Sequence, residues 1–197
     1  ALLTSSLQDT ATEGLEVIVE GDKQVLGPEL TQLFRRTPQL RGWHAQQLVK
    51  FGAVLKSDYQ ATLVLDADTI LLKQRVFLAA DGVQILPIGQ SYRRQYEAQF
   101  ESYFASRKKT PMMFITHHQL MQKDVVHKMF PRPSSLLDWV RFSLLSDHFW
   151  ISEYDSYGSF LERHFPRRVR YASWGNTKGF VGPESASDGG LEKVVAS

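Results

Sequence analysis

The chain has no cysteine, no long apolar run and little net charge. Without thiols, neither a disulfide framework nor a thiolate metal site can form. No stretch reaches the roughly 18 apolar residues that a membrane-spanning helix needs, and the amino end lacks the charged and apolar regions of a signal peptide. We therefore expect a cytoplasmic protein without a transmembrane segment. The formal net charge of +2 is too small to indicate nucleic-acid binding by itself.

What the chain does have is enough length and apolar content for one folded domain. Its 197 residues allow a substantial core, and the 43% of hydrophobic residues is ordinary for a globular protein. Four Trp and twelve Phe indicate an aromatic core or a surface on which sugar rings stack. We expect the domain at residues 1–182 and a mobile tail at residues 183–197.

The most informative stretch is residues 61–72, an apolar run broken by Asp66 and Asp68. Residues 61–65 have the composition of a strand buried on both faces of a parallel sheet. Because residues two apart in extended chain point the same way, both carboxylates would face one side at the carboxyl edge of the sheet, where α/β folds bind ligands. Such a pair suits a Mg²⁺ or Mn²⁺ ion that also binds diphosphate oxygens. A structural turn is the competing interpretation, because Asp is common in turns.

The run Leu65-Asp66-Ala67-Asp68, with a second apolar run after it, resembles the Asp-x-Asp signature of glycosyltransferases with the GT-A fold. The resemblance implies a single GT-A-like, Rossmann-like α/β/α sandwich with a mostly parallel sheet. It also implies that Asp66 and Asp68 hold Mn²⁺ or Mg²⁺, and that Asp66 contacts a nucleotide-diphosphate sugar as donor. A GT-A domain opens with a strand that contacts the nucleotide base. We find none before Ala1, so either the chain is shortened or the resemblance fails at this end.

A polar stripe marks the helix predicted at residues 40–56. His44, Gln47 and Lys50 stand three apart, so that amide and ammonium donors would line one side of the helix. The spacing alone favours a solvated face. Residues 41–50 nevertheless resemble a segment shared by a group of bacterial glycosyltransferase-like proteins of largely unassigned specificity, in which this helix faces the donor. The resemblance implies that Gln47 and Lys50 bind the donor.

Two adjacent histidines, His117 and His118, follow a short apolar strand predicted at residues 112–116. If that strand runs parallel to residues 61–65, the histidines lie at the same sheet edge as the Asp pair. We expect both to contact the acceptor or the donor. A structural role and a zinc site are the alternatives, although adjacent side chains point in different directions on any regular element.

Residues 152–158 contain a further carboxylate of interest. Ser152 and Asp155 have the spacing of a capping box, which accounts for both residues. It does not account for Glu153, for which a solvated first-turn carboxylate is the simple interpretation. The run from Ser152 to Gly158 resembles the second hallmark of the same group of proteins. The resemblance implies that Glu153 is the base of an inverting enzyme, ionised near neutral pH because of the helix dipole.

The remaining patterns predict further elements of an α/β fold. We expect strands at residues 15–20, 83–88 and 169–174, and helices at residues 28–34, 92–109, 118–129 and 134–145. In the second of these helices, an aromatic stripe from Tyr92 to Tyr103 favours a core face over a ligand site, and the basic residues 107–109 end the helix where cations favour its dipole. Four arginines between Arg163 and Arg170 favour a solvated basic edge, with a clamp for the leaving diphosphate as the alternative. Residues 174–179 loosely resemble the donor-gripping segment of one retaining GT-A family, although Ala172 replaces the expected histidine. Inversion and retention therefore both stay open.

These features predict a metal-dependent glycosyltransferase, with either Mn²⁺ or Mg²⁺, that moves a sugar from a nucleotide-diphosphate donor to a hydroxyl acceptor. Surface polysaccharide or glycan synthesis is the expected setting. The alternative is a catalytically inactive GT-A-like domain that binds a nucleotide or a glycan, and the missing first strand favours it.

Overall fold

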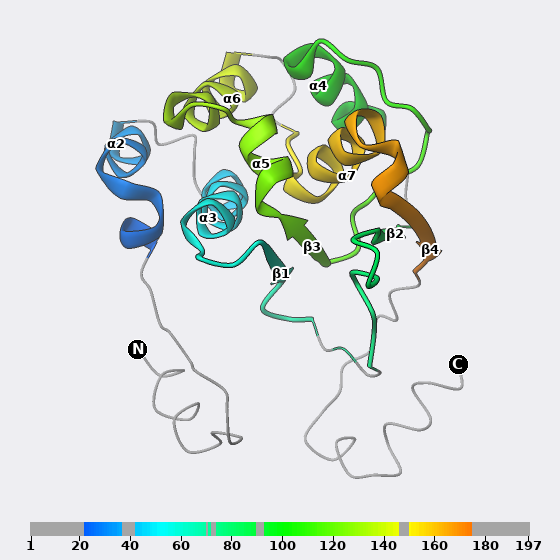
Figure 1. Cartoon of the computed structure of the whole chain (residues 1–197). Coiled ribbons are helices and arrows are strands. Elements are labelled where there is room, and N and C mark those ends of the chain that lie inside the picture. The colour runs from blue at the N-terminus through cyan, green and yellow to red at the C-terminus, as the bar shows by residue number, and fades with distance from the viewer. Residues whose placement is uncertain are drawn as a thin grey trace, which may run out of the picture.

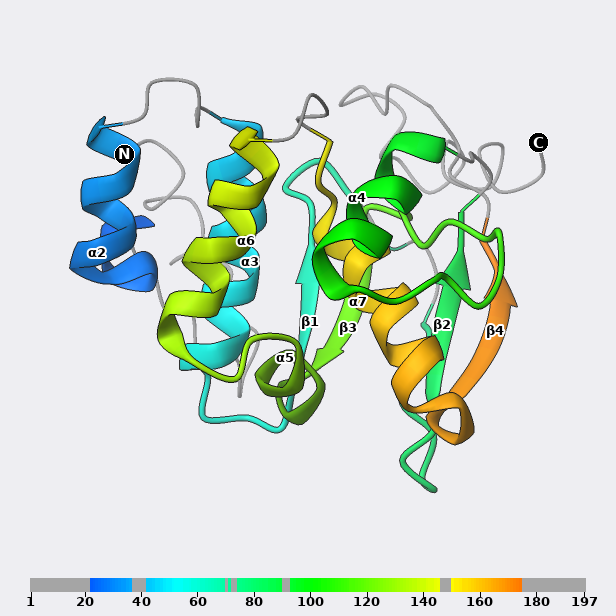
Figure 2. The ribbon, with the colours of Figure 1, turned by 90° about the horizontal axis from the view of Figure 1, so that it is seen from above.

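The computed structural model describes residues 22–36, 42–69, 71, 74–89, 93–145 and 150–174. Within them the chain is an α/β structure, in which the strands lie together and the helices α4 to α7 lie on one side of them (Figures 1 and 2). Several expectations lie outside the described residues: the strand at 15–20, the segment after Trp174 and the tail at 183–197.

Helices and strands are interspersed along the chain, as expected for an α/β fold. The helices are α2 (Asp22–Arg36), α3 (Trp43–Lys56), α4 (Arg94–Phe104), α5 (Lys123–Met129), α6 (Pro133–Leu145), α7 (Glu153–His164) and the short 3₁₀ helix η1 (Pro166–Arg168). The strands are β1 (Ala61–Leu65), β2 (Gln84–Ile88), β3 (His118–Gln122) and β4 (Val169–Ser173).

The strands form two pairs. β1 pairs antiparallel with β3, so that Leu65 lies opposite His118, and β2 pairs in parallel with β4. Figure 2 shows the order β1, β3, β2, β4, and Gln84 Nε2 on β2 donates to the backbone oxygen of Leu120 on β3 at 2.7 Å. A side-chain hydrogen bond thus joins the two pairs in the middle of the row.

The core lies between the strands and the helices. Val64 of β1 and Met121 of β3 are buried in one apolar cluster with residues of α3, α5, α6 and α7, whereas Leu63 and Leu65 are exposed. This alternation is typical of strands that are covered on one face only. The expectation that residues 61–65 are buried on both faces is therefore wrong for the described part of the chain.

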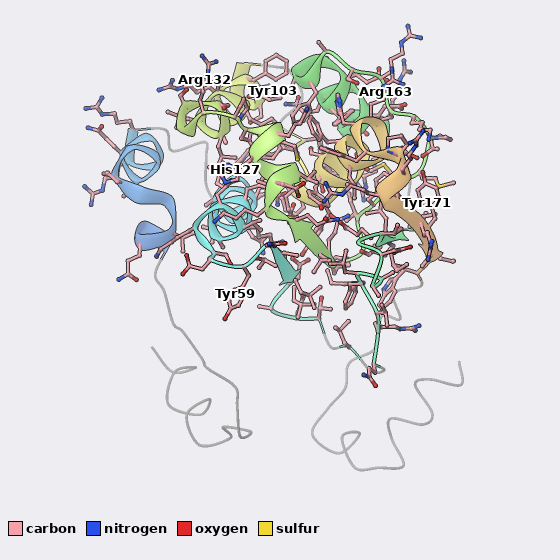
Figure 3. The ribbon with its side chains drawn as sticks, in the orientation of Figure 1. Tyr59, Tyr103, His127, Arg132, Arg163 and Tyr171 are labelled. Carbon is pink, nitrogen blue, oxygen red and sulfur yellow. The ribbon has the colours of Figure 1, made fainter. Side chains whose placement is uncertain are left out.

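The aromatic stripe predicted after residue 92 belongs to this core. Tyr96 and Phe100 on α4 are buried, as expected, and Tyr103 donates its hydroxyl to the backbone oxygen of Ser135 at 2.8 Å. That bond ties α4 to α6, and Tyr103 lies between these helices in Figure 3.

The loop at residues 112–117, which leads into β3, packs closely against two glycines. A Cβ atom on Gly89, after β2, would lie 2.5 Å from the backbone oxygen of Ile115. On Gly158 of α7 it would lie 2.4 Å from a ring carbon of Phe114. Both contacts are too short for any real Cβ atom, so the two glycines allow the loop to pass and to deliver the start of β3 to the end of β1.

Three expectations about this region need correction. Residues 112–116 are not a strand, since only Met113 forms an isolated bridge, to Gly89. Residues 118–122 are strand β3 rather than helix, and the helix α5 begins at Lys123. The polar residues of β3 conceal its strand character, because their partners, such as Gln84 for Gln122, come from distant segments. With one antiparallel and one parallel pair, the described strands are not mostly parallel.

Candidate active site

Four elements meet where β1 ends. Asp66 follows β1 directly, and its backbone N–H donates to the backbone oxygen of His117 at 2.9 Å, which extends the β1–β3 ladder by one bond. The middle of α3 and the first turn of α7 approach the same point, bringing Lys50 and Glu153. Residues from three separate sequence motifs therefore come together.

Lys50 is at the centre of this site. Its ammonium donates to Asp66 Oδ1, to Glu153 Oε1 at 2.5 Å and to the Tyr154 hydroxyl at 3.3 Å. The Tyr154 hydroxyl in turn donates to Asp66 Oδ1 at 2.9 Å. We call these four residues the Lys50 cluster. The side chain of Lys50 is only 10% exposed and that of Glu153 only 2%, so the charges interact with little screening by water.

Gln47 fixes the cluster to the backbone of α7. Its Oε1 accepts the backbone N–H of Glu153 at 2.7 Å, which satisfies a donor at the start of the helix. His44 and Gln47 are both buried. The interpretation of this helix face as solvated is therefore wrong, and the polar stripe points into the protein because it has polar partners there.

The cluster shifts the protonation of its members in opposite directions. Burial favours a raised pKa for Asp66, but the bonds from Lys50, His117 and Tyr154 outweigh it and hold that pKa below its ordinary value. For Glu153 burial dominates and raises the pKa, although Lys50 opposes it. Burial, followed by the nearby carboxylates, raises the pKa of Tyr154, so its hydroxyl keeps its proton and donates.

His117 lies on the exposed side of Asp66. Its Nδ1 is 2.9 Å from Asp66 Oδ2, and its backbone has a φ of 61°, a left-handed conformation that is uncommon for a residue with a side chain. The backbone oxygen of His117 accepts from Thr69 Oγ1 at 3.2 Å. The histidine therefore lies near the Asp pair, as expected, but for another reason: an antiparallel strand begins where β1 ends.

His118 is turned the other way and is fully buried. Its Nδ1 lies 2.8 Å from the backbone oxygen of Thr116, and its ring packs against Trp174 and Phe77, with centroid distances of 4.1 and 5.6 Å. Burial lowers the pKa of His118, which favours the neutral imidazole. In this conformation His118 does not reach solvent, so a contact with an acceptor or a donor stays a prediction.

The expected metal ligands are arranged unevenly. Asp68 is exposed, whereas the Asp66 carboxylate already accepts bonds from Lys50, Tyr154 and His117. In the part of the chain that the structure describes, no three His, Asp or Glu side chains are grouped closely enough to hold a metal ion by themselves. A cation here would need oxygen ligands from a substrate as well.

A second buried ion pair involves Asp155, in the first turn of α7. Lys108 and Asp155 are both inaccessible, and Lys108 Nζ donates to the two carboxylate oxygens at 2.8 and 3.1 Å. Asp155 also accepts the backbone N–H of Phe114 at 3.3 Å. Ser152 caps the helix by accepting the N–H of Asp155, as predicted, but the Asp155 carboxylate binds Lys108 rather than completing a capping box. Lys108 lies beyond the end of α4 and is buried, so it does not end that helix as a cation, and its pairing with Asp155 offsets the desolvation cost of burying it.

The arginines of residues 163–170 bind the protein's own carboxylates in part. Arg168 pairs with Asp124 at 2.6 Å and also donates to Gln122, and Arg170 pairs with Asp81 at 2.9 Å. The basic-edge interpretation is thus correct for Arg170, which is exposed, and a diphosphate clamp gains no support from Arg168.

Tyr154 is the residue of the site that sequence reasoning missed. It stands directly after Glu153 in the motif at residues 152–158, and that adjacency at a helix start was the only available signal. Its role depends on the approach of Asp66, which lies 88 residues away along the chain.

Fold and site together define an α/β protein with a buried charged cluster at the end of a strand. The family of unknown function DUF6492 matches residues 5–165, most of the chain, and the chain belongs to this family. The match includes the Lys50 cluster, Asp68 and both histidines. No curated protein and no solved structure matches significantly. Among the described residues, no helix is long and apolar enough to cross a membrane.

Proposed function

We propose that the chain is a GT-A-type, metal-dependent glycosyltransferase that moves a sugar from a nucleotide-diphosphate donor to a hydroxyl acceptor. The observation that carries the proposal is the convergence of Asp66 and Glu153 on one ammonium, that of Lys50. Sugar transfer needs a group that serves the leaving diphosphate and a base for the acceptor, held close to one another. Two carboxylates from distant motifs, at one strand end, are suited to those tasks.

Asp68 and the Oδ2 side of Asp66 would hold Mn²⁺ or Mg²⁺, with His117 beside them. The set fits, because carboxylates suit both ions and a cation that binds diphosphate oxygens needs only one or two protein carboxylates. When bound, the ion would neutralise charge on the leaving diphosphate. Lys50 supplies a second positive charge next to the same carboxylate.

Glu153 is the proposed base. As the acceptor oxygen bonds to the sugar carbon and the bond to the diphosphate breaks on the opposite side, the hydroxyl proton passes to the Glu153 carboxylate. Burial raises the pKa of Glu153, which makes it a stronger base than a solvated glutamate. Gln47 and Lys50 hold it in place through its backbone and its carboxylate, respectively.

A thermal-shift screen of nucleotide-diphosphate sugars, with and without Mn²⁺, tests the proposal. A donor present at 100 times its dissociation constant should add about 2.7 kcal/mol of stability. Asp68→Asn should lose the Mn²⁺-dependent part of the shift while staying folded, because Asp68 is exposed. Asp58→Asn, an exposed carboxylate before the start of β1, is the matched control and should keep it. Unchanged Mn²⁺-dependent binding by Asp68→Asn would remove the metal site from the proposal.

The second candidate is a binding domain without catalysis. The burial of Glu153 and its pairing with Lys50 favour it, because the base is covered in this conformation. Turnover separates the two candidates. A domain that only binds would give the thermal shift but would release no nucleoside diphosphate from the same sugar nucleotide.

A further inference from the structure

Two tryptophans beside the start of α7 have no role in the site described so far. Trp43 and Trp150 are 44% and 43% exposed. The indole Nε1 of Trp43, at the start of α3, donates to the backbone oxygen of Ile151 at 2.8 Å. Because Ile151 follows Trp150 in the chain, this bond brings the start of α3 to the segment that carries Trp150, and Glu153 comes only two residues after Ile151.

Both indoles are held in place by the protein. The hydrogen bond to Ile151 fixes the nitrogen end of Trp43, so that its exposed surface is ring surface. Trp150 packs edge-on against the buried ring of Tyr96, with centroids 6.0 Å apart and an interplanar angle of 86°. The guanidinium of Arg93 lies 5.9 Å from the centroid of the Trp150 ring. Aromatic rings that are already ordered lose little conformational entropy when a ligand packs on them.

We propose that Trp43, Trp150 and Arg93 form a binding surface for a pyranose ring of the acceptor. One face of a pyranose is a set of C–H groups that packs on an indole, and the hydroxyls at its rim accept hydrogen bonds from a guanidinium. Naming this sugar as the acceptor rests on the proposed function. Trp43 binds the backbone of the segment that leads into Glu153, the proposed base, whereas His117 is bound to Asp66 on the metal side. The acceptor contact expected of His118 is thereby assigned to other residues.

The test uses the free protein, labelled with ¹⁵N at the indole nitrogens, and follows its indole N–H signals by NMR. The probes are the methyl glycosides of glucose, galactose, mannose and N-acetylglucosamine, each raised to about 100 mM so that weak millimolar binding is captured. We expect the signals of Trp43 and Trp150 to shift with at least one glycoside, and that of the fully buried Trp139 to stay unchanged. Uridine and guanosine monophosphates are the competing probes, because nucleobases also stack on indoles.

Two outcomes would overturn the inference: no shift of Trp43 or Trp150 with any glycoside, or shifts with a nucleotide alone. The measurement uses no metal, sugar nucleotide or turnover. A protein that binds glycosides here but transfers no sugar would therefore contradict the proposed function and leave this surface standing.

Variants locate the surface. Trp150→Ala and Trp43→Ala should each weaken glycoside binding roughly three- to tenfold, the range of a lost aromatic contact. If Trp150→Ala or Trp43→Ala does not fold, two milder variants replace it in the test. Trp43→Phe keeps an aromatic ring, and Arg93→Ala removes only an exposed cation. Tyr59→Ala is the control, since Tyr59 is 74% exposed and precedes the start of β1, whereas Asp66 follows the end of that strand. Equal loss in Tyr59→Ala, or none in Trp150→Ala, would contradict the assignment.

Discussion

Lys50 Nζ lies 2.5 Å from Glu153 Oε1, in a pair that joins α3 to α7 across 103 residues of sequence. The same ammonium also binds Asp66, so one positive charge serves two carboxylates in a site with little access to water. Charges taken out of water are stable only when they are paired and hydrogen-bonded. Lys50 is therefore the residue on which the ionised state of this site depends.

Replacing Lys50 with methionine should destabilise the protein by about 3–5 kcal/mol, because the buried carboxylate of Glu153 loses its partner. Urea unfolding measures the change. Lys109→Met is the matched control, since Lys109 is exposed, and it should change stability by less than about 0.5 kcal/mol. The double variant Lys50→Met with Glu153→Gln should recover part of the loss, because the buried charge is gone. A loss below about 1 kcal/mol in Lys50→Met alone would contradict this account.

The elements of the site could be predicted from sequence better than their arrangement. The strand at Ala61–Leu65 and the helix start at Glu153 follow from local apolar patterns and a capping serine, and both predictions are confirmed. The direction of β3 could not be predicted, because its residues pair with β1 and β2 through long-range contacts. The prediction that His117 lies near Asp66 assumes a parallel strand before it, whereas His117 lies there because the antiparallel strand β3 starts at that edge.

Asp155→Asn should cost far more than the loss of an ordinary helix cap. The amide cannot neutralise Lys108, whose ammonium is inaccessible and has no other carboxylate within salt-bridge distance among the described residues. We expect a loss of about 3–5 kcal/mol in urea unfolding. Asp138→Asn is the matched control: Asp138 is half exposed and 3.7 Å from Arg141, so its loss should stay within about 0.5 kcal/mol. Equal losses in the two variants would show that the buried pair contributes no more to stability than the exposed pair.

Gly158→Ala tests the close approach of α7 to the loop at residues 112–117. The added methyl group would lie 2.4 Å from the ring of Phe114, which is fully buried and has little room to shift. We expect a loss of about 1–3 kcal/mol, typical of overpacking. Ser159→Ala, at the next position of the helix, removes a buried hydroxyl that has no hydrogen-bond partner in the described structure, and it should be neutral or slightly stabilising. If Gly158→Ala leaves the stability unchanged, the loop at residues 112–117 can move away from α7 at little cost.

Neither Gly158 nor the Lys108–Asp155 pair could have been assigned from sequence. The residues around Gly158 do not indicate that an aromatic ring packs on this glycine. Lys108 belongs to a basic run, Arg107 to Lys109, that is typical of solvated residues. Both depend on where the loop at residues 112–117 passes, and that is decided by tertiary packing. Local patterns therefore predict where a helix begins, whereas they do not predict which of its residues are buried as charges.

Asp124 should make the stability of the protein depend on acid pH in a defined direction. The hydrogen bond from Arg168 holds the pKa of Asp124 below its ordinary value of 3.8, so the pair stabilises the fold above that pH and is lost as the pH falls through the lowered pKa. Asp124→Asn should therefore be less stable than the parent protein near pH 7, by less than about 1 kcal/mol because the pair is partly exposed.

That difference between Asp124→Asn and the parent protein should shrink towards zero as the pH falls through the lowered pKa of Asp124. Urea unfolding should compare the two proteins at each pH. Burial raises the pKa of Asp155, so the contribution of Asp155 to stability changes with pH in the opposite direction to that of Asp124. Asp58→Asn controls for removing a surface carboxylate. A difference that persists at low pH would mean that the ion pair is not its cause.

Glu153→Gln addresses the proposed chemistry directly. Gln keeps the shape of the side chain and an oxygen that can accept from Lys50, but it cannot take a proton from an acceptor hydroxyl. Because positioned base catalysis contributes about 10²- to 10⁴-fold, turnover of a sugar nucleotide should fall by that factor while the donor-induced thermal shift stays nearly unchanged. Glu162→Gln is the matched control: Glu162 is a buried glutamate of the same helix, it binds Thr110 and Tyr171, and its loss should leave turnover within about twofold. If Glu153 is the base of an inverting displacement, as proposed, the product should have the anomeric configuration opposite to that of the donor. Full turnover in Glu153→Gln, or a product that retains the donor's configuration, would show that Glu153 is not the base and that its burial against Lys50 serves the fold alone.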